Sequence, residues 1–295
     1  MDFKEELLQK TELVNNIIKG FYPKEEGLQK IIFEAMNYSI EAGGKRLRPI
    51  FMMEVAKLFN GFNKDIEPFM AALEMIHTYS LVHDDLPAMD NDDYRRGMLT
   101  THKKYGHAMG ILAGDALLNF AFETAADAVY DATDVNKAAR ALKVLGKKAG
   151  AYGMIGGQVV DVKLSGSKVT KEELDFIYEN KTSALIEAAF VIGAILSGAD
   201  DKQIEQVEKA AFNIGMAFQI QDDILDVIGD AEIIGKPVLS DEKNEKTTYV
   251  TLYGVEGAKT YVKNYTDEAI NILVNVGKEN VFLKDLIISL INREK

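Results

Sequence analysis

The chain has 295 residues, and its 46 Asp and Glu residues outnumber its 34 Lys and Arg residues, which gives a net charge of −12. Nucleic-acid binding needs a dominant basic surface, so this balance argues against that class of protein. The absence of cysteine excludes a disulfide framework, a thiolate zinc site and a cysteine nucleophile, while 47% hydrophobic residues are enough for a large core.

The N-terminal segment and the apolar runs predict neither export nor membrane insertion. Residues 1–6 are acidic where a secretory signal begins with a basic segment. The most apolar run, 183–199, is interrupted by Glu187 and is shorter than the roughly 20 residues that cross a bilayer. We therefore expect a cytoplasmic protein without a membrane partner.

Five prolines in the whole chain leave long segments free to be helical. At 65–86 the apolar residues recur at spacings of three and four, as on the core-facing side of a helix, with Pro68 in the first turn. At 170–198, Thr170 and Glu173 form a capping box that opens a long helix. Further helices are predicted at 28–42, 107–131, 201–228, 255–276 and 280–291.

Strand signals are sparse. The run 247–253 is rich in Thr, Tyr and Val, but the sequence offers it no partner strand. No linker, low-complexity tract or repeat divides the chain. We therefore predict an all-α protein with a single domain over residues 1–295.

Aspartates cluster behind two strongly apolar helices. In the later cluster, Asp222 and Asp226 are four apart, so an unbroken helix places both carboxylates on one face. Two like charges in that arrangement repel each other unless a cation lies between them.

In the earlier cluster, Asp84 and Asp90 are six apart and would diverge on a regular helix. Pro87 lies between them and can distort the chain enough to return Asp90 to Asp84. Solvated acidic helix ends would explain one such cluster, whereas two clusters favour a site for cations.

Carboxylate oxygens suit Mg²⁺, which keeps water ligands and often shares a phosphate with the protein. An EF-hand is excluded at 90–101, because Arg95 occupies its glycine position and Thr101 its glutamate position.

Other common ligand-binding motifs are missing from the sequence. No Gly-Lys pair is followed by Ser or Thr, so a P-loop is absent. The histidines lack the i, i+4 spacing of a helical zinc pair. The glycines at 150–157 favour close helix packing over dinucleotide binding. The His77 side chain either donates a hydrogen bond to a phosphate or is a core histidine whose hydrogen bonds are made within the protein.

Cations are concentrated in two short segments. Lys45, Arg46 and Arg48 follow a glycine pair, where flexible backbone and planar guanidinium groups make a good cradle for an anion. Arg95 and Arg96 follow the first aspartate cluster. Complementation of helix dipoles would explain either segment alone, but in a chain of this net charge both are candidates for phosphate binding.

These motifs together resemble the short-chain trans-prenyltransferases. The shared pattern consists of Asp-Asp-x4-Asp and Asp-Asp-x2-Asp far apart in the chain, Gly-Gly-Lys-x2-Arg-Pro upstream, and Arg-Arg-Gly after the first aspartate motif. The match is closest to bacterial farnesyl diphosphate synthases and covers residues 43–250. The sequence departs from the family at Leu99, where proline is usual, and at Leu239, where glycine is usual.

The resemblance implies the isoprenoid synthase fold, with roughly ten or more long helices around a central apolar cavity. It implies Mg²⁺-dependent head-to-tail condensation of isopentenyl diphosphate with dimethylallyl or geranyl diphosphate, which gives farnesyl diphosphate and pyrophosphate. Three Mg²⁺ ions are implied, with Mn²⁺ as a substitute, and the family forms homodimers.

The resemblance also implies a role for each matching residue. The metal-bound allylic diphosphate would be held by Asp84, Asp85, Asp90, Asp222 and Asp226, with Asp223 in the same site, and by Arg95, Lys181 and Lys236. Isopentenyl diphosphate would be held by Lys45, Arg48, His77 and Arg96. The allylic cation would be stabilised by the Lys181 carbonyl and the side-chain oxygens of Thr182 and Gln219.

Product length is expected to depend on the helix that ends at Asp84. At 1.5 Å per residue, Tyr79 lies about 7 to 8 Å below the diphosphate and Ser80 about 6 Å below it. In the family an aromatic residue five positions before the first aspartate accompanies a fifteen-carbon product, and Tyr79 matches. The alternative interpretation is that Tyr79 only fills space in the core.

Other functions remain open at this point. A geranyl or geranylgeranyl diphosphate synthase would differ only in product. A terpene cyclase shares the fold and one aspartate motif but normally carries an Asn/Ser/Glu metal motif in place of 222–226. A non-catalytic helical scaffold with divalent-ion patches would leave the coincidence of acidic and basic motifs unexplained.

Overall fold

The computed structural model describes residues 2–228 and 247–293. Within that part 76% of the residues are helical and the sheet is a two-stranded hairpin, so the predicted all-α class is confirmed. The chain forms two compact units: unit 1 comprises residues 1–53 and 62–143, and unit 2 comprises residues 54–61 and 144–295. The single domain expected from the sequence stays a prediction.

Unit 1 contains short and long helices and the hairpin. Its helices are α1 (Phe3–Lys19), α2 (Lys30–Glu41), the 3₁₀-helix η1 (Lys64–Ile66), α4 (Glu67–Asp84), α5 (Thr101–Tyr105) and α6 (His107–Asp131). Strands β1 (Tyr94–Arg95) and β2 (Met98–Leu99) pair antiparallel after α4, with Tyr94 opposite Leu99. Two helices, α3 (Leu47–Ala56) and α7 (Val135–Ala149), begin in unit 1 and end in unit 2.

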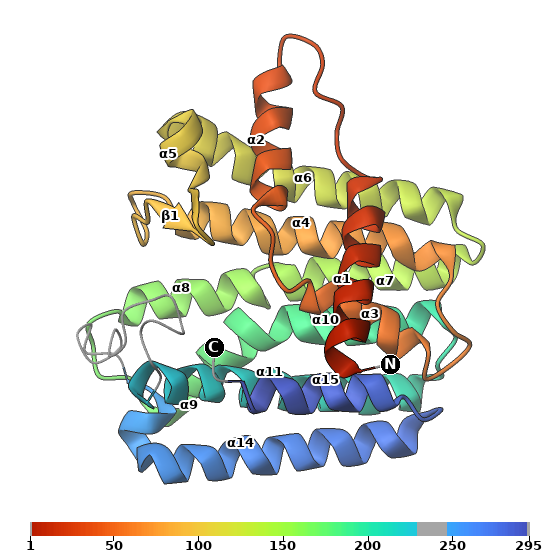
Figure 1. The fold of residues 1–295 in the computed structure, drawn as a ribbon, viewed down its shortest axis with the longest axis vertical. Coiled ribbons are helices and arrows are strands. Elements are labelled where there is room, and N and C mark those ends of the chain that lie inside the picture. The colour runs from red at the N-terminus through yellow and green to blue at the C-terminus, as the bar shows by residue number, and fades with distance from the viewer. Residues whose placement is uncertain (1, 229–246, 294–295) are drawn as a thin grey trace. The chain divides into compact units, whose positions relative to one another are not determined.

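The helix predicted at 65–86 is confirmed as η1 followed by α4, with Pro68 in the first turn of α4. Most residues of α4 are buried, which explains why its apolar spacing is visible in the sequence. Helix α6 lies beside α4 (Figure 1). Gly114 of α6 permits this contact, because a Cβ there would lie 2.1 Å from His83 Nε2.

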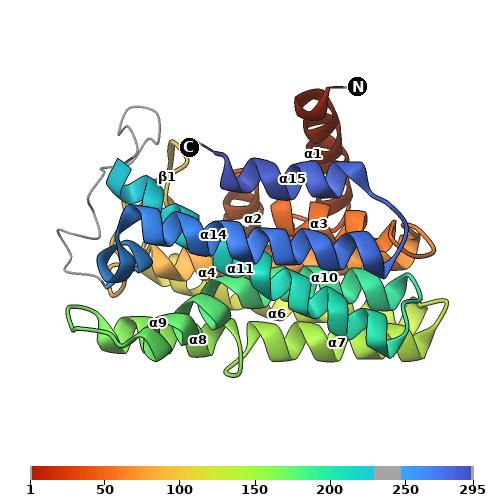
Figure 2. The same ribbon diagram turned by 90° about the horizontal axis from the view of Figure 1, so that it is seen from below.

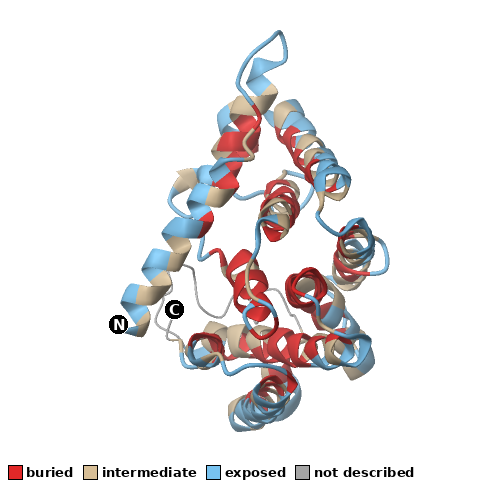
Figure 3. Cartoon of the chain, turned by 90° about the vertical axis from the view of Figure 1, so that its right-hand side faces the viewer, coloured by how far each residue is buried: buried red, intermediate tan, exposed pale blue. Residues whose placement is uncertain are grey.

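Unit 2 is built from the later helices. They are α8 (Met154–Leu164), α9 (Lys171–Ile177), the π-helix η2 (Tyr178–Ser183), α10 (Ala184–Leu196), α11 (Asp201–Ile228), α14 (Tyr249–Val276) and α15 (Val281–Ile291). Helix α11 packs against α14, and α15 contacts both (Figure 2). Many helices are buried on one side and exposed on the other (Figure 3), whereas every residue of α10 is buried. No described helix is long and apolar enough to span a membrane.

The segment 170–198 differs in part from its prediction. The capping box is confirmed, because Thr170 Oγ1 accepts from the Glu173 N–H and the Glu173 carboxylate accepts from the Thr170 N–H. The predicted long helix is present, since the chain is helical without a break from Lys171 to Leu196, but its turn at η2 is π-helical and not α-helical.

Close contacts with two neighbouring helices accompany the π-helical turn. A Cβ on Gly157 of α8 would lie 2.2 Å from the Lys181 backbone N, and one on Gly215 of α11 would lie 2.2 Å from Ser183 Oγ. Only glycine allows such approaches. The predicted use of the 150–157 glycines for close helix packing is therefore confirmed at Gly157, while the turn itself depends on contacts that local sequence does not encode.

The remaining predicted helices agree closely with the structure. Those at 107–131 and 201–228 are α6 and α11, and those at 28–42 and 280–291 are α2 and α15 within a few residues. Helix α14 begins earlier than predicted and bends at Gly254, where φ is 69°. The run with strand-like composition is therefore mostly the first turn of α14, capped by the Thr248 side chain. Helices α1, α5, α7 and α8 were not predicted.

Candidate active site

The first aspartate motif lies in unit 1, where α4 ends. Beyond Asp84 the chain turns, and the Asp90 N–H donates to the Asp84 carbonyl at 2.8 Å. This is the return of Asp90 that the sequence predicts from Pro87. The Asp84 side chain is half-buried and Asp90 is exposed, so both carboxylates are accessible to a ligand.

Asp85 is placed differently from Asp84 and Asp90. It is buried, and it accepts hydrogen bonds from Arg95 Nε at 2.9 Å and from Arg95 Nη2 at 2.5 Å. Burial alone would lower the pKa of Arg95, but the Asp85 carboxylate outweighs it and the pKa is raised. The sequence-based role of Asp85 as a metal ligand stays a prediction, and in this structure its oxygens face Arg95.

Arg46 belongs to the interior of unit 1. Its guanidinium donates to Glu74 Oε1 at 2.7 Å, to Asn15 Oδ1 at 2.8 Å and to the Ile40 carbonyl at 2.7 Å. The side chains of Arg46 and Glu74 are only 4% and 3% exposed, so they form a buried ion pair. Glu74 was not singled out from the sequence, although a glutamate within the otherwise apolar run 69–76 is a usable signal.

Arg48, unlike Arg46, has a donor that makes no hydrogen bond. Its Nε is buried and has no hydrogen-bond partner among the described residues. Burial lowers the pKa of Arg48, Glu74 opposes that shift and Arg96 adds to it. A buried donor without a partner is unfavourable, so an anionic oxygen that reached Arg48 would gain a strong hydrogen bond.

Arg96 joins Arg48 at the glycine pair. Its guanidinium donates to the Gly43 carbonyl and lies so close to Gly44 that a Cβ there would be 2.7 Å from Arg96 Nη1. Gly43 and Gly44 have φ angles of 84° and 137°, which favour glycine. Lys45 is exposed beside them. The predicted cradle is therefore assembled within unit 1, from two segments far apart in the sequence.

His77 faces the same cluster of cations. Burial lowers the pKa of His77 well below its ordinary value, and Arg48, Arg96, Arg46 and Arg95 lower it further in that order. The imidazole is therefore neutral near pH 7. A neutral imidazole can still donate one hydrogen bond to a phosphate oxygen.

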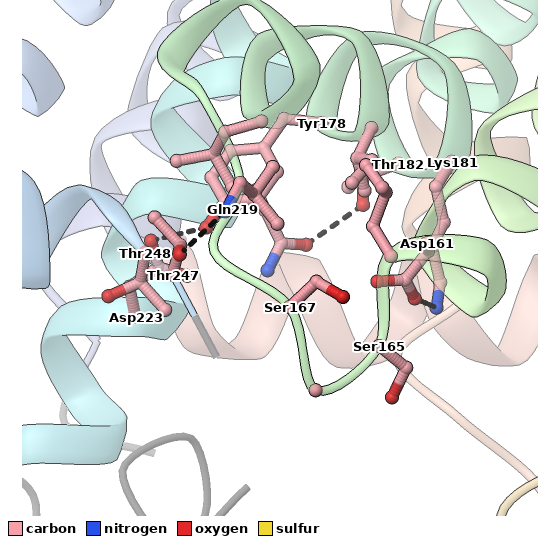
Figure 4. A pocket seen from close by; sticks show the side chains of 15 residues that line it. Asp161, Ser165, Ser167, Tyr178, Lys181, Thr182, Gln219, Asp223, Thr247 and Thr248 are labelled. Carbon is pink, nitrogen blue, oxygen red and sulfur yellow. Dashed lines mark hydrogen bonds and ion pairs between the residues drawn. The ribbon is translucent and has the colours of Figure 1, made fainter. Parts of the chain in front are cut away.

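Unit 2 holds a pocket lined by α8 and the loop after it, by α9, η2 and α11, and by the two threonines before α14 (Figure 4). Lys181 Nζ pairs with Asp161 Oδ2 at 2.5 Å, and Thr182 Oγ1 donates to Gln219 Oε1 at 2.8 Å. The structure thus brings together the three residues predicted to surround the allylic cation. Asp161 was not found from the sequence, because a single aspartate on α8 carries no signal.

The second aspartate motif also lies in unit 2, near the end of α11. Asp222 is 44% exposed and accepts a hydrogen bond from Arg293, whose guanidinium also donates to the Phe218 carbonyl at 3.2 Å. Asp226 is half-buried one turn further along. Asp223 lies in the wall of the same pocket as Lys181 and Gln219, and it is only 3% exposed. Arg293, near the end of the chain, was not found from the sequence.

The residues predicted to limit product length lie on α4. Tyr79 is 6% exposed, and its ring packs edge-on against His83 with centroids 5.8 Å apart. Burial, together with the negative charge of Asp84, raises the pKa of Tyr79 to about 12. Ser80 Oγ donates to the His77 carbonyl at 2.9 Å. Tyr79 therefore lies on the face of α4 that carries His83, which contacts α6 through the Ile111 carbonyl.

Two further predictions concern loops. Leu99, which departs from the family pattern, lies on β2 and is 42% exposed, and its carbonyl accepts from the Tyr38 hydroxyl at 2.7 Å. Lys236 and Leu239 lie outside the described residues.

Comparison with known proteins adds independent findings. A family model described as polyprenyl synthetase matches residues 29–280. Farnesyl diphosphate synthase from Micrococcus luteus is 42% identical over 294 residues, which cover 99% of each chain. The large subunit 1 of a chloroplastic heterodimeric geranylgeranyl pyrophosphate synthase from Arabidopsis thaliana is 42% identical, over 95% of this chain and 76% of that protein. The crystal structure of a geranyltransferase from Legionella pneumophila has a TM-score of 0.86 and 30% identity, over 99% of this chain and 97% of that one.

Proposed function

Because the chain belongs to the polyprenyl synthetase family and is a prenyltransferase, we propose that it makes farnesyl diphosphate. The reaction joins isopentenyl diphosphate head-to-tail to dimethylallyl diphosphate and then to geranyl diphosphate, and it releases pyrophosphate at each step. The names of the relatives support this product class, and the residues of the two units support the chemistry.

The observation that carries the proposal is the arrangement of charged side chains within each unit, where cations gather in one place and accessible carboxylates in another. In unit 1, Arg96 lies against the glycine pair, and Arg48 has a buried Nε without a hydrogen-bond partner among the described residues. In the same unit, Asp84 and Asp90 carry accessible carboxylates on residues whose backbones are joined by a hydrogen bond. A cationic cradle and a carboxylate pair are what a diphosphate and a metal-bound diphosphate require.

The carboxylates fit Mg²⁺. Asp84 and Asp90 in unit 1, and Asp222 and Asp226 in unit 2, offer the hard oxygen ligands that this ion prefers. Among the described residues no group of three or more His, Cys, Asp or Glu side chains forms a closed metal site. Mg²⁺ usually takes one or two carboxylates and completes its shell with water and substrate phosphate, so an open carboxylate pair suits it. When bound, it neutralises the charge of the departing pyrophosphate.

The protein's own residues then have separate tasks. Lys45, Arg48 and Arg96 bind isopentenyl diphosphate, and His77, kept neutral by the surrounding cations, donates a hydrogen bond to it. Arg95 is held by Asp85 at a fixed position beside the first motif.

In unit 2, Lys181 contacts the allylic diphosphate while Asp161 orients its ammonium group. The Lys181 carbonyl and the linked oxygens of Thr182 and Gln219 stabilise the allylic cation by electrostatic attraction. The double bond of isopentenyl diphosphate attacks that cation, and the pyrophosphate takes the proton released afterwards. No side chain acts as a nucleophile.

The fifteen-carbon product rests on Tyr79. Its buried ring, on the face of α4 that carries His83, is bulky enough to stop a growing hydrocarbon chain. A geranylgeranyl product, which some relatives are named for, would need that space to be open.

We propose that the chain works as a homodimer in the cytoplasm. Helix α6 exposes Ile111 and Leu112, each 48% exposed. Helix α8 exposes Ile155, Val159 and Val162 at the spacing of one helix face. Exposed apolar side chains gathered on one helix mark protein–protein contact, and light scattering in solution tests the dimer.

The test of the function is direct. The purified protein is incubated with dimethylallyl diphosphate, radiolabelled isopentenyl diphosphate and Mg²⁺, and the product is dephosphorylated and sized. We expect a fifteen-carbon alcohol, and no label in product when Mg²⁺ is chelated. A ten- or twenty-carbon product would correct the chain length only. Consumption of allylic diphosphate without isopentenyl diphosphate would point to a cyclase, and no turnover would refute the proposal.

A further inference from the structure

The second aspartate motif contains one carboxylate that is enclosed by protein. Asp223 is 3% exposed, whereas the Asp222 side chain next to it is 44% exposed. Successive helical residues are turned by about 100°, so Asp223 points away from Asp222, although it lies only three positions from Asp226. Its Oδ2 accepts the Tyr178 hydroxyl at 2.6 Å and the Tyr249 backbone N–H at 3.1 Å.

These two donors come from different elements. Tyr178 is the first residue of the π-helix η2, and Tyr249 is the first residue of α14. Their rings stack with centroids 5.7 Å apart, and they are only 6% and 0% exposed. Asp223 therefore joins three elements, α11, η2 and α14, at one buried point.

The same elements carry groups that meet the substrate in the proposed reaction. Helix α11 carries Asp222 and Gln219, and η2 carries Lys181 and Thr182. The hydrogen bond from Thr182 to Gln219 is a second link between α11 and η2, on the pocket side (Figure 4). With both links in place, η2 can neither slide along α11 nor rotate against it without breaking a short hydrogen bond.

We propose that Asp223 is a positioning residue: the Tyr178 hydroxyl and the Tyr249 amide hold its carboxylate inside the protein, and this fixes α11 and η2 so that Asp222 meets the metal-bound diphosphate. The inference rests on the proposed function. Asp223 itself touches neither metal nor substrate.

A direct metal-ligand role for Asp223 is disfavoured by its surroundings. A cation at Asp223 Oδ2 would have to displace a buried hydroxyl and a buried amide and leave both donors without a partner. Mg²⁺ also gives up its water reluctantly and binds most readily to accessible carboxylates. Asp222 and Asp226 meet that condition better than Asp223.

The test compares two variants that each remove one buried tyrosine hydroxyl. Tyr178→Phe removes the hydroxyl that donates to Asp223. Tyr249→Phe removes the hydroxyl that donates to Asp175 Oδ1 at 2.5 Å and keeps the backbone N–H that reaches Asp223. The two rings stay stacked in both variants, so the variants differ mainly in which carboxylate loses its donor.

The readout is binding of Mn²⁺ in the presence of inorganic pyrophosphate, measured by calorimetry, together with the melting temperature and the steady-state constants. Tyr178→Phe should weaken Mn²⁺ binding by about tenfold or more, the scale of one hydrogen bond to a charged group. It should lower kcat to a similar extent and leave the KM for isopentenyl diphosphate unchanged. Tyr249→Phe should lower the melting temperature and leave Mn²⁺ affinity at the wild-type value.

Equal loss of Mn²⁺ affinity in both variants, or loss in neither, would overturn the inference, because the tyrosines would then serve stability alone. The double variant Tyr178→Phe/Asp223→Asn gives a second check. If Asp223 acts through Tyr178, the double variant binds Mn²⁺ no more weakly than Asp223→Asn does. Multiplied losses would identify Asp223 as an independent ligand and refute the positioning role. A wild-type protein that bound no Mn²⁺ with pyrophosphate would instead refute the proposed function.

Discussion

Two arginines of one motif, Arg46 and Arg48, should respond to the same substitution in opposite ways. Arg46 is enclosed with Glu74 and makes hydrogen bonds to three groups. Arg46→Gln leaves Glu74 as an unpaired buried charge, a change that destabilises proteins by about 3–5 kcal/mol. For a chain of 295 residues, with an unfolding entropy of about 2.1 cal/mol/K per residue, that corresponds to a fall in melting temperature of roughly 5 to 8 °C.

Arg48→Gln should spare the fold. The substitution removes a buried Nε that has no described partner, so the melting temperature should stay at the wild-type value or rise slightly. It also removes a charge-assisted contact to isopentenyl diphosphate of about 1.5 to 3 kcal/mol, which raises the KM for that substrate roughly 10- to 150-fold. The KM for the allylic substrate should hardly change.

Thermal unfolding followed by circular dichroism, and steady-state kinetics with each substrate varied in turn, measure both effects on the same preparations. An Arg46→Gln protein that kept its melting temperature and lost affinity for isopentenyl diphosphate would show that the assignment of the two arginines is reversed. If Arg48→Gln raised both KM values equally, Arg48 would not belong to one substrate site.

Three further predictions follow from the site. Asp84→Ala or Asp222→Ala should lower kcat by at least about 100-fold with little change in melting temperature, because each loses an electrostatic group that acts in the transition state; near-normal turnover would refute the metal assignment. Tyr79→Ala should shift the main product from fifteen carbons to twenty or more, and Ser80→Phe should shift it towards ten, as product sizing would show; an unchanged product from an active Tyr79→Ala enzyme would place the limit elsewhere. The lowered pKa of His77 means that the unfolded state binds its proton more readily than the folded state. The free energy of unfolding should therefore fall as the pH drops below about 6.5, the ordinary histidine pKa, and chemical denaturation of His77→Gln should show a weaker dependence than the wild type.

The sequence was sufficient for features that depend on local spacing. The three- and four-residue recurrence of apolar side chains located α4, since a helix that buries one face must repeat at that period. The spacing of Asp222 and Asp226 placed both on one face for the same reason. Pro87 predicted the turn that returns Asp90 to Asp84, because proline disturbs a helix locally.

Other features were decided by partners distant in the sequence. Arg46 and Arg48 look equivalent in their motif, and only the position of Glu74 on α4 makes the first structural and leaves the second available. The same applies to Asp223, which reads as one of three aspartates until Tyr178 and the Tyr249 amide enclose it.

The π-helical turn at η2 also depends partly on local sequence and partly on contacts with distant segments. A capping box and an apolar run predicted one helix, and both are present, yet the contacts of Gly157 and Gly215 accompany a wider turn in its middle. Periodicity and capping determine that a helix forms, because they act within a few residues. The packing of helices from distant segments determines where that helix widens and which of its charged groups are buried, because burial depends on atoms that the local sequence does not contain.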